Sequence, residues 1–155
     1  MAWANSKIFR PFVADLLSNT VAFDLDTDTP KVALYDNDIT PSSDVTAANS
    51  AYNAGQWVVT GNEVTDTNWP AGGRPLVSGA VSTGAGFVMY DAADTAGAGN
   101  VTLANVFGCL VYDDTITTPV ADQGLSYNYF GGAQSVTAGT FTVIWHANGI
   151  FRFTF

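Results

Sequence analysis

The sequence has almost no cysteine or histidine: Cys109 and His146 are the only ones among 155 residues. A single cysteine cannot form an intrachain disulfide bond, so no oxidising compartment is implied. One cysteine and one histidine also fall short of the four ligands of a common zinc site. Cys109 lies in the apolar run Gly-Cys-Leu-Val-Tyr. That run favours a buried thiol over a nucleophile paired with His146.

Basic residues are also scarce. Five Lys and Arg residues stand against fourteen Asp and Glu residues, which gives a net charge of −9. Nucleic acids and anionic membrane surfaces are bound through basic side chains, so we expect neither as a partner. The simplest use of the acidity is solubility, and an acidic surface also complements a basic patch on a protein partner.

Glutamate is nearly absent, and several sequence motifs of enzymes are absent as well. Glu63 is the only glutamate, so a carboxylate pair for glycoside cleavage would need scattered aspartates. The chain has no Gly-x-Ser-x-Gly elbow, no P-loop and no complete dinucleotide-binding fingerprint. We therefore expect a protein that is not an enzyme, with no catalytic residues and no cofactor.

One acidic run, Asp24, Asp26 and Asp28, opens like a calcium-binding loop. An EF-hand loop needs Gly at its sixth position and Glu at its twelfth, but Thr29 and Tyr35 stand there. We interpret the run as a solvated turn, with a bound cation as the alternative.

Long apolar runs are absent. No stretch reaches the length of a membrane-spanning helix, and the first twelve residues lack the apolar segment of a signal peptide. We therefore expect no membrane association and no ordinary export signal.

What the chain does contain is typical of a β protein. Aspartate favours turns over helix interiors, and Gly, Asn, Asp and Pro separate short apolar runs. This pattern predicts a mainly β, single-domain antiparallel β-sandwich or jelly-roll-like fold with a short N-terminal helix. One domain would span residues 1–155, with an arm and helix over 1–20 and the β-sandwich over 21–155. The expected strands are 31–35, 56–60, 75–82, 86–90, 106–112, 126–130 and a last pair within 141–155.

Local signals place the helices and turns. Apolar residues at helical spacing predict a helix over 10–18, with Pro11 in its first turn and Asn19 near its end. Asn5 and Ser6 are possible N-caps. We also expect a short helix at 45–51 inside the loop 36–54, and a long hairpin closed by the loop 113–123. The pair Gly131-Gly132 should break the chain after the strand at 126–130.

The last fifteen residues carry the strongest short-range signal. Asn148-Gly149 lies between alternating apolar residues, which predicts a two-residue β-hairpin turn. Counting outward from this turn pairs His146 with Phe151 and Trp145 with Arg152. His146 would then pack on an aromatic sheet face, and Trp145 would stack on Arg152. The final strand would be packed to its last residue.

Four tryptophans, at positions 3, 57, 69 and 145, allow two interpretations. They are core and interface anchors, or they line a sugar-binding groove as in a carbohydrate-binding module. In a small β domain the first interpretation is favoured.

Three blocks of the sequence resemble a family of small virion proteins of tailed bacteriophages. They are an aromatic-rich helix at 9–17, Asp-Leu-Asp-Thr-Asp-Thr-x-Lys-Val-Ala-Leu at 24–34, and Gly-Thr-Phe-Thr-x-x-Trp-x-Ala-Asn-Gly-Ile at 139–150. The strand at 109–112 is similar as well. The resemblance implies a structural role in the virion, with no catalytic residues to carry over. Its members look like head or tail components.

Among these roles we favour a capsid decoration protein that binds the major capsid protein on the outside of the shell. The protein would be made in the bacterial host cytoplasm and reside in the virion. A trimer or another symmetric oligomer is plausible. The candidate contact residues are Trp3, Ile8, Phe9 and Phe12; the alternative is that they cover the domain's own core. A tail or tail-tip protein, or a carbohydrate-binding module that contacts the host, are the other functions considered.

Overall fold

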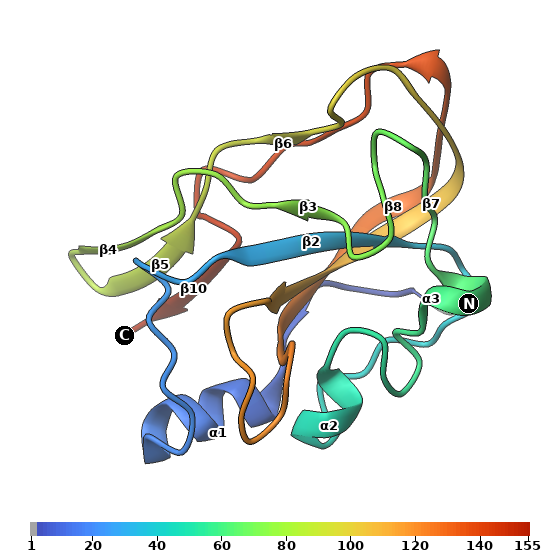
Figure 1. The fold of residues 1–155 in the computed structure, drawn as a ribbon. Coiled ribbons are helices and arrows are strands. Elements are labelled where there is room, and N and C mark those ends of the chain that lie inside the picture. The colour runs from blue at the N-terminus through green and yellow to red at the C-terminus, as the bar shows by residue number, and fades with distance from the viewer. Residues whose placement is uncertain (1–2) are drawn as a thin grey trace.

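Antiparallel strands are the main regular structure of the computed structural model, which describes residues 3–155 (Figure 1). The strands are β1 (Lys7–Ile8), β2 (Pro30–Tyr35), β3 (Arg74–Pro75), β4 (Ala80–Gly84), β5 (Phe87–Asp91), β6 (Thr95–Ala96), β7 (Val101–Asp113), β8 (Gly124–Gly139), β9 (Thr142–Val143) and β10 (Phe151–Thr154). The helices are α1 (Arg10–Ser18), α2 (Ala47–Ser50) and α3 (Val59–Asn62).

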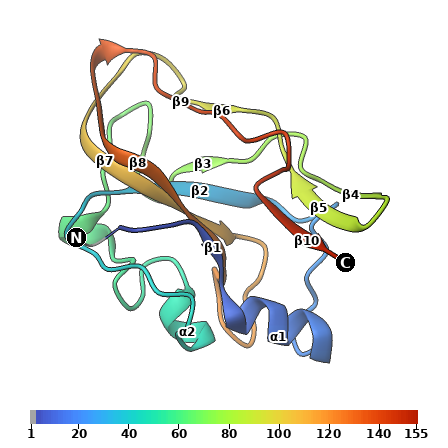
Figure 2. The same ribbon diagram turned by 180° about the vertical axis from the view of Figure 1, so that it is seen from behind.

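The strands form three sheets. The largest has the order β1-β8-β7-β2-β3, a second has the order β10-β5-β4, and β6 pairs with β9. Every pair is antiparallel. The three-stranded sheet and helix α1 lie at the same end of the molecule (Figures 1 and 2). The prediction of a mainly β, antiparallel, sandwich-like fold with a short N-terminal helix is confirmed.

The hairpin of β7 and β8 is the longest element pair, and the turn 114–123 closes it as predicted. Both strands extend well beyond the predicted ranges. Gly131 and Gly132 do not break the chain: they have φ angles of 81° and 152° within β8. The pairing shifts from Gly108↔Tyr129 to Val106↔Gln134 around them. The two glycines therefore form a bulge, because only glycine adopts such angles without strain.

Helix α1 matches the predicted range of 10–18, since its ends are set locally. Pro11 lies in the first turn, and Asn19 ends the helix in a left-handed conformation with φ 52°. The predicted N-caps are wrong, because Phe9 is the cap residue and no side chain caps the helix. The Ser6 hydroxyl instead accepts a hydrogen bond from Tyr129 N–H at 3.0 Å, because β1 joins the sheet at this point.

Two predicted strands differ from the structure. Residues 56–60 form no strand: a turn from Trp57 N–H to Ala54 O (2.9 Å) leads into α3. The apolar pair at 57–58 instead places the Trp57 ring in the buried core. Residues 75–82 divide into β3 and β4, because Ser78 between them has a φ of 57°. The predicted strands at 31–35 and 86–90 and the short helix within 45–51 are present.

The predicted terminal hairpin is wrong. β9 pairs with β6 and β10 pairs with β5, so the two segments are not partners of each other. Gly149 N–H donates to His146 O at 2.7 Å, and only Gly149 of the turn pair has a positive φ. Arg152 lies 3.9 Å above the Phe87 ring rather than against Trp145. Phe155 is 88% exposed, so the last residue is not packed.

A single apolar cluster joins residues from Trp3 to Phe151. The Trp57 ring is fully buried in this cluster. Its centroid lies 5.1 Å from the ring centroid of Tyr35, 5.9 Å from that of Phe9 and 6.0 Å from that of Trp3. These edge-to-face contacts bring together segments from the first 57 residues of the chain.

Candidate docking pocket

Three of the four predicted contact residues belong to the core. Trp3 is 1% exposed, and Phe9 and Phe12 are completely buried. Trp3 also donates its Nε1–H to the Asp36 carbonyl at 2.6 Å. Their burial favours the alternative that they cover the domain's own core, although Phe12 also lines a pocket. Ile8 is half-buried against the same core.

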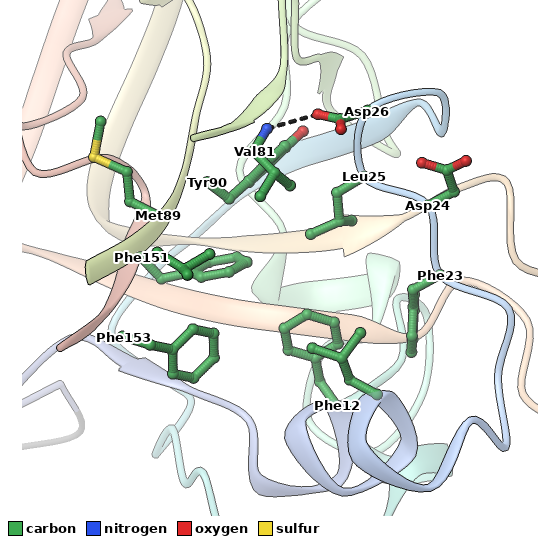
Figure 3. Close-up of a pocket in the computed structure, with 12 residues that line it drawn as sticks. Phe12, Phe23, Asp24, Leu25, Asp26, Val81, Met89, Tyr90, Phe151 and Phe153 are labelled. Atoms are coloured by element: carbon green, nitrogen blue, oxygen red, sulfur yellow. Dashed lines mark hydrogen bonds between the residues drawn. The ribbon is translucent and has the colours of Figure 1, made fainter. Parts of the chain in front are cut away.

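Phe12 also lines an apolar pocket, which lies between α1 and the three-stranded sheet (Figure 3). The pocket has a volume of about 260 Å³. Its walls come from three parts of the chain: Phe12 and Leu16 of α1, Phe23 and Leu25 of the following segment, and Val81, Val88, Tyr90, Phe151 and Phe153 of the sheet. Figure 3 shows the rings of Phe12, Phe23, Phe151 and Phe153 around this space.

The floor and the rim of the pocket differ in exposure. Phe12, Tyr90 and Phe151 lie in the floor and are at least nine-tenths buried, whereas Leu16 is 44% and Val81 40% exposed. Phe12 and Phe151 pack edge to face in the floor, with ring centroids 5.6 Å apart. Apolar side chains at the mouth and a buried apolar floor suit an anchor side chain from a partner.

Negative charge lines the upper edge of the pocket. Asp24 and Asp26 line it and are exposed (Figure 3). Asp26 accepts a hydrogen bond from Val81 N–H at 2.7 Å, which ties the 23–28 segment to β4. None of the basic residues that the structure describes lines the pocket. A basic group beside the anchor side chain would therefore be attracted to this edge.

The acidic run at 24–28 is a turn, as interpreted from the sequence. Asp28 N–H donates to Asp24 O at 2.7 Å, and Asp24 N–H donates to the Asp28 carboxylate at 2.7 Å. Its carboxylates thus serve the backbone of the turn and of β4. Among residues 3–155, no group of three or more His, Cys, Asp or Glu side chains is placed to hold a metal ion.

Cys109 and His146, the two residues considered for chemistry, lie in different environments. Cys109 is fully buried, and burial raises the pKa of its thiol to about 12. The interpretation of Cys109 as an apolar packing residue is confirmed. His146 is exposed, and its Nδ1 accepts a hydrogen bond from Asn148 N–H at 3.0 Å. The prediction that His146 packs on an aromatic face is wrong, because the hairpin that required it does not form.

The single glutamate, Glu63, belongs to a hydrogen-bond network within the fold. Glu63 accepts hydrogen bonds from the Tyr52 hydroxyl and from Gly72 N–H, both at 2.9 Å. The Tyr112 hydroxyl donates to Gly72 O at 2.7 Å, and the Tyr52 and Tyr112 rings stack with centroids 4.7 Å apart. Burial raises the pKa of Glu63. This network holds the 52–73 segment against β7.

The tryptophans do not form a sugar-binding platform. Trp3, Trp57 and Trp69 are buried to 99% or more. Trp145 is half-buried, and its Nε1–H donates to Thr95 at 3.3 Å. The interpretation as core anchors is confirmed for the first three.

No helix among the described residues is long and apolar enough to cross a membrane. Comparisons with protein-family models, with curated proteins and with solved structures found no match to this chain.

Proposed function

We propose that this protein is a structural protein of a bacteriophage virion that decorates the capsid, binding the outer surface of the shell. The resemblance of the 9–17, 24–34 and 139–150 blocks to small virion proteins supports this role. Two of these blocks contribute to the pocket: Phe12 and Leu16 come from the first, and Asp24, Leu25 and Asp26 from the second.

The observation that carries the proposal is the apolar pocket with its acidic edge. Of the four residues expected to contact the shell, Phe12 lies in the floor of this pocket, whereas Trp3 and Phe9 are buried and do not line it. The occupant is an apolar side chain of the major capsid protein with a basic residue next to it. A shell repeats one contact many times, so modest affinity at each site is sufficient when copies also associate with one another, as in a trimer.

The test is binding to purified empty shells, measured by co-sedimentation and located by electron microscopy of the particles. Even coverage of the shell supports decoration. Binding confined to tails would replace this role with a tail or tail-tip role, and no binding to any part of the particle would contradict both.

A substitution at the mouth of the pocket tests the docking surface. Leu16→Glu should weaken shell binding about tenfold or more, because a charge replaces an apolar side chain at a desolvated contact. Leu17→Glu is the matched control: Leu17 is 82% exposed on the same helix and does not line the pocket. Equal effects of the two variants would place the contact elsewhere, and thermal unfolding of both checks their folding.

A further inference from the structure

Two sheets end in short open strands that border one groove. β1 is the outermost strand on one side of the large sheet, and β10 is outermost on one side of the three-stranded sheet. The groove between them has a volume of about 390 Å³ and is lined by Lys7 and Ile8 of β1 and by Phe151 and Arg152 of β10. Figure 2 labels both strands, and residues of each line the same groove.

The pairing of β1 with β8 leaves the backbone groups of Ile8 unused. Phe9 N–H donates to Leu125 O of the β8 side at 3.0 Å, and Ile8 is paired with Ser126. Hydrogen-bonded and non-hydrogen-bonded pairs alternate in an antiparallel ladder. The N–H and C=O groups of Ile8 therefore point away from β8.

The same alternation applies to β10. Phe155 N–H donates to Gly86 O at 2.9 Å, in register with the pairing of Phe153 and Val88. Arg152 and Thr154 alternate with the hydrogen-bonded residues Phe153 and Phe155. Their N–H and C=O groups therefore point away from β5. An open strand edge of this kind is a template for an added strand.

The groove is positively charged although the chain has a net charge of −9. Among residues 3–155, Lys7 and Arg152 are the only charged residues that line it. The two ion pairs among residues 3–155 are Arg10–Asp44 and Lys31–Asp114, and neither involves the groove. The floor contains buried Phe151. The groove thus combines open backbone groups, an apolar floor and positive charge.

We propose that this groove binds an extended, acidic segment of a partner polypeptide, which pairs with the free edge of β10 as an additional strand. About four to six residues of the segment would pair, given the length of β10. Alternate side chains would cover the floor, and acidic ones would lie near Lys7. This site shares Phe151 with the pocket at α1 but is otherwise lined by different residues, and the proposal does not depend on a role in the virion.

Selection from a library of displayed random peptides, with the full-length protein as target, tests the proposal. The enriched peptides should alternate apolar and acidic residues. Binding of a selected peptide should slow hydrogen exchange of the Arg152 amide at least about tenfold, since that N–H becomes a strand hydrogen bond. Methylation of the peptide amides that face β10 should abolish binding, whereas methylation of the other set should not.

Charge reversal provides the matched comparison. Lys7→Glu should weaken a selected peptide about fivefold at low ionic strength, and by less as salt screens the interaction. Arg10→Glu changes the charge equally at an exposed ion pair outside the groove and should have little effect. Failure to enrich acidic peptides, or enriched peptides that leave the Arg152 amide unprotected, would show that the groove does not bind such a segment. Lys7 and Arg152 would then serve only to keep the strand edges from pairing.

Discussion

At the residue scale, the carboxyl group of Asp113 has an unusual environment. Asp113 is fully buried at the end of β7. One of its oxygens accepts a hydrogen bond from Thr115 N–H at 2.9 Å, and the other has no partner among the described residues. Burial, and then the nearby Asp28 carboxylate, raise the pKa of Asp113 to about 7. The folded protein therefore favours the protonated acid.

This pKa predicts a direction for stability against pH. In the unfolded chain an aspartate titrates near pH 3.9, so between about pH 4 and about pH 7 the folded state binds the extra proton. The contribution of Asp113 to the free energy of unfolding should fall as the pH rises through this range. Asp113→Asn should flatten the fall and stabilise the protein at about pH 8, because a neutral amide replaces a buried charge.

Denaturant unfolding at several pH values measures this effect. Asp44→Asn removes one negative charge from a side chain that is 77% exposed, and serves as the control. An unchanged pH dependence in Asp113→Asn would show that other groups cause it.

At the element scale, the β7–β8 hairpin organises the large sheet, because β1 joins it on one side and β2 on the other. Gly108 lies where this hairpin meets the N-terminal arm. A Cβ atom at this position would come within 2.5 Å of both the Trp3 ring and the Asn128 carbonyl oxygen. The lack of a side chain at Gly108 thus allows Trp3 to pack on the sheet.

Gly108→Ala should therefore lower the free energy of unfolding by about 1–3 kcal/mol, as overpacking in a core does. Ala104→Ser adds one atom at an exposed position of the same strand and should change stability by less than about 0.5 kcal/mol. Chemical denaturation with tryptophan fluorescence measures both. If Gly108→Ala were as stable as the unmodified protein, the segment that carries Trp3 would have moved aside without a loss of stability.

The elements also show which local signals predict structure. Helix α1 was predictable because Pro11 and Asn19 act within one turn of their own positions. The Asn148-Gly149 signal is equally local but failed, because β5 and β6 offered partners that bury Phe151 and Val143. Strand pairing depends on such burial across the whole sheet more than on the turn residues.

The candidate site was predictable only in part. The 9–17 and 24–28 segments drew attention in the sequence, and both contribute residues to the pocket. Their relevant side chains were not predictable: Leu16 lies at the mouth, whereas Phe9 is buried. Whether a side chain of this segment lies in the core or at the surface depends on where Trp57 and Phe151 lie in space. The spacing of apolar residues within the segment does not contain that information.

At the scale of the whole molecule, acidity dominates solution behaviour. The isoelectric point is about 4.1, so charge repulsion between copies is lost near that pH. Turbidity should be greatest near pH 4.1, although Asp113 contributes most to stability at low pH. Light scattering and denaturant unfolding on the same samples separate the two effects. A turbidity maximum that coincides with loss of folded structure would show that unfolding, and not charge neutralisation, causes aggregation.

Composition and short-range spacing determined that this protein is rich in antiparallel strands, acidic, without an intrachain disulfide and provided with one short helix over 10–18. These properties depend on residue type or on interactions within a few positions. Only the tertiary structure decided the partners of β9 and β10, the burial of the N-terminal aromatic residues and the pocket beside Leu16. These features depend on contacts between segments that are distant in the chain, such as Phe12 with Phe151. The burial of apolar surface drives such contacts, and because it is non-directional, local sequence patterns do not specify which distant residues meet.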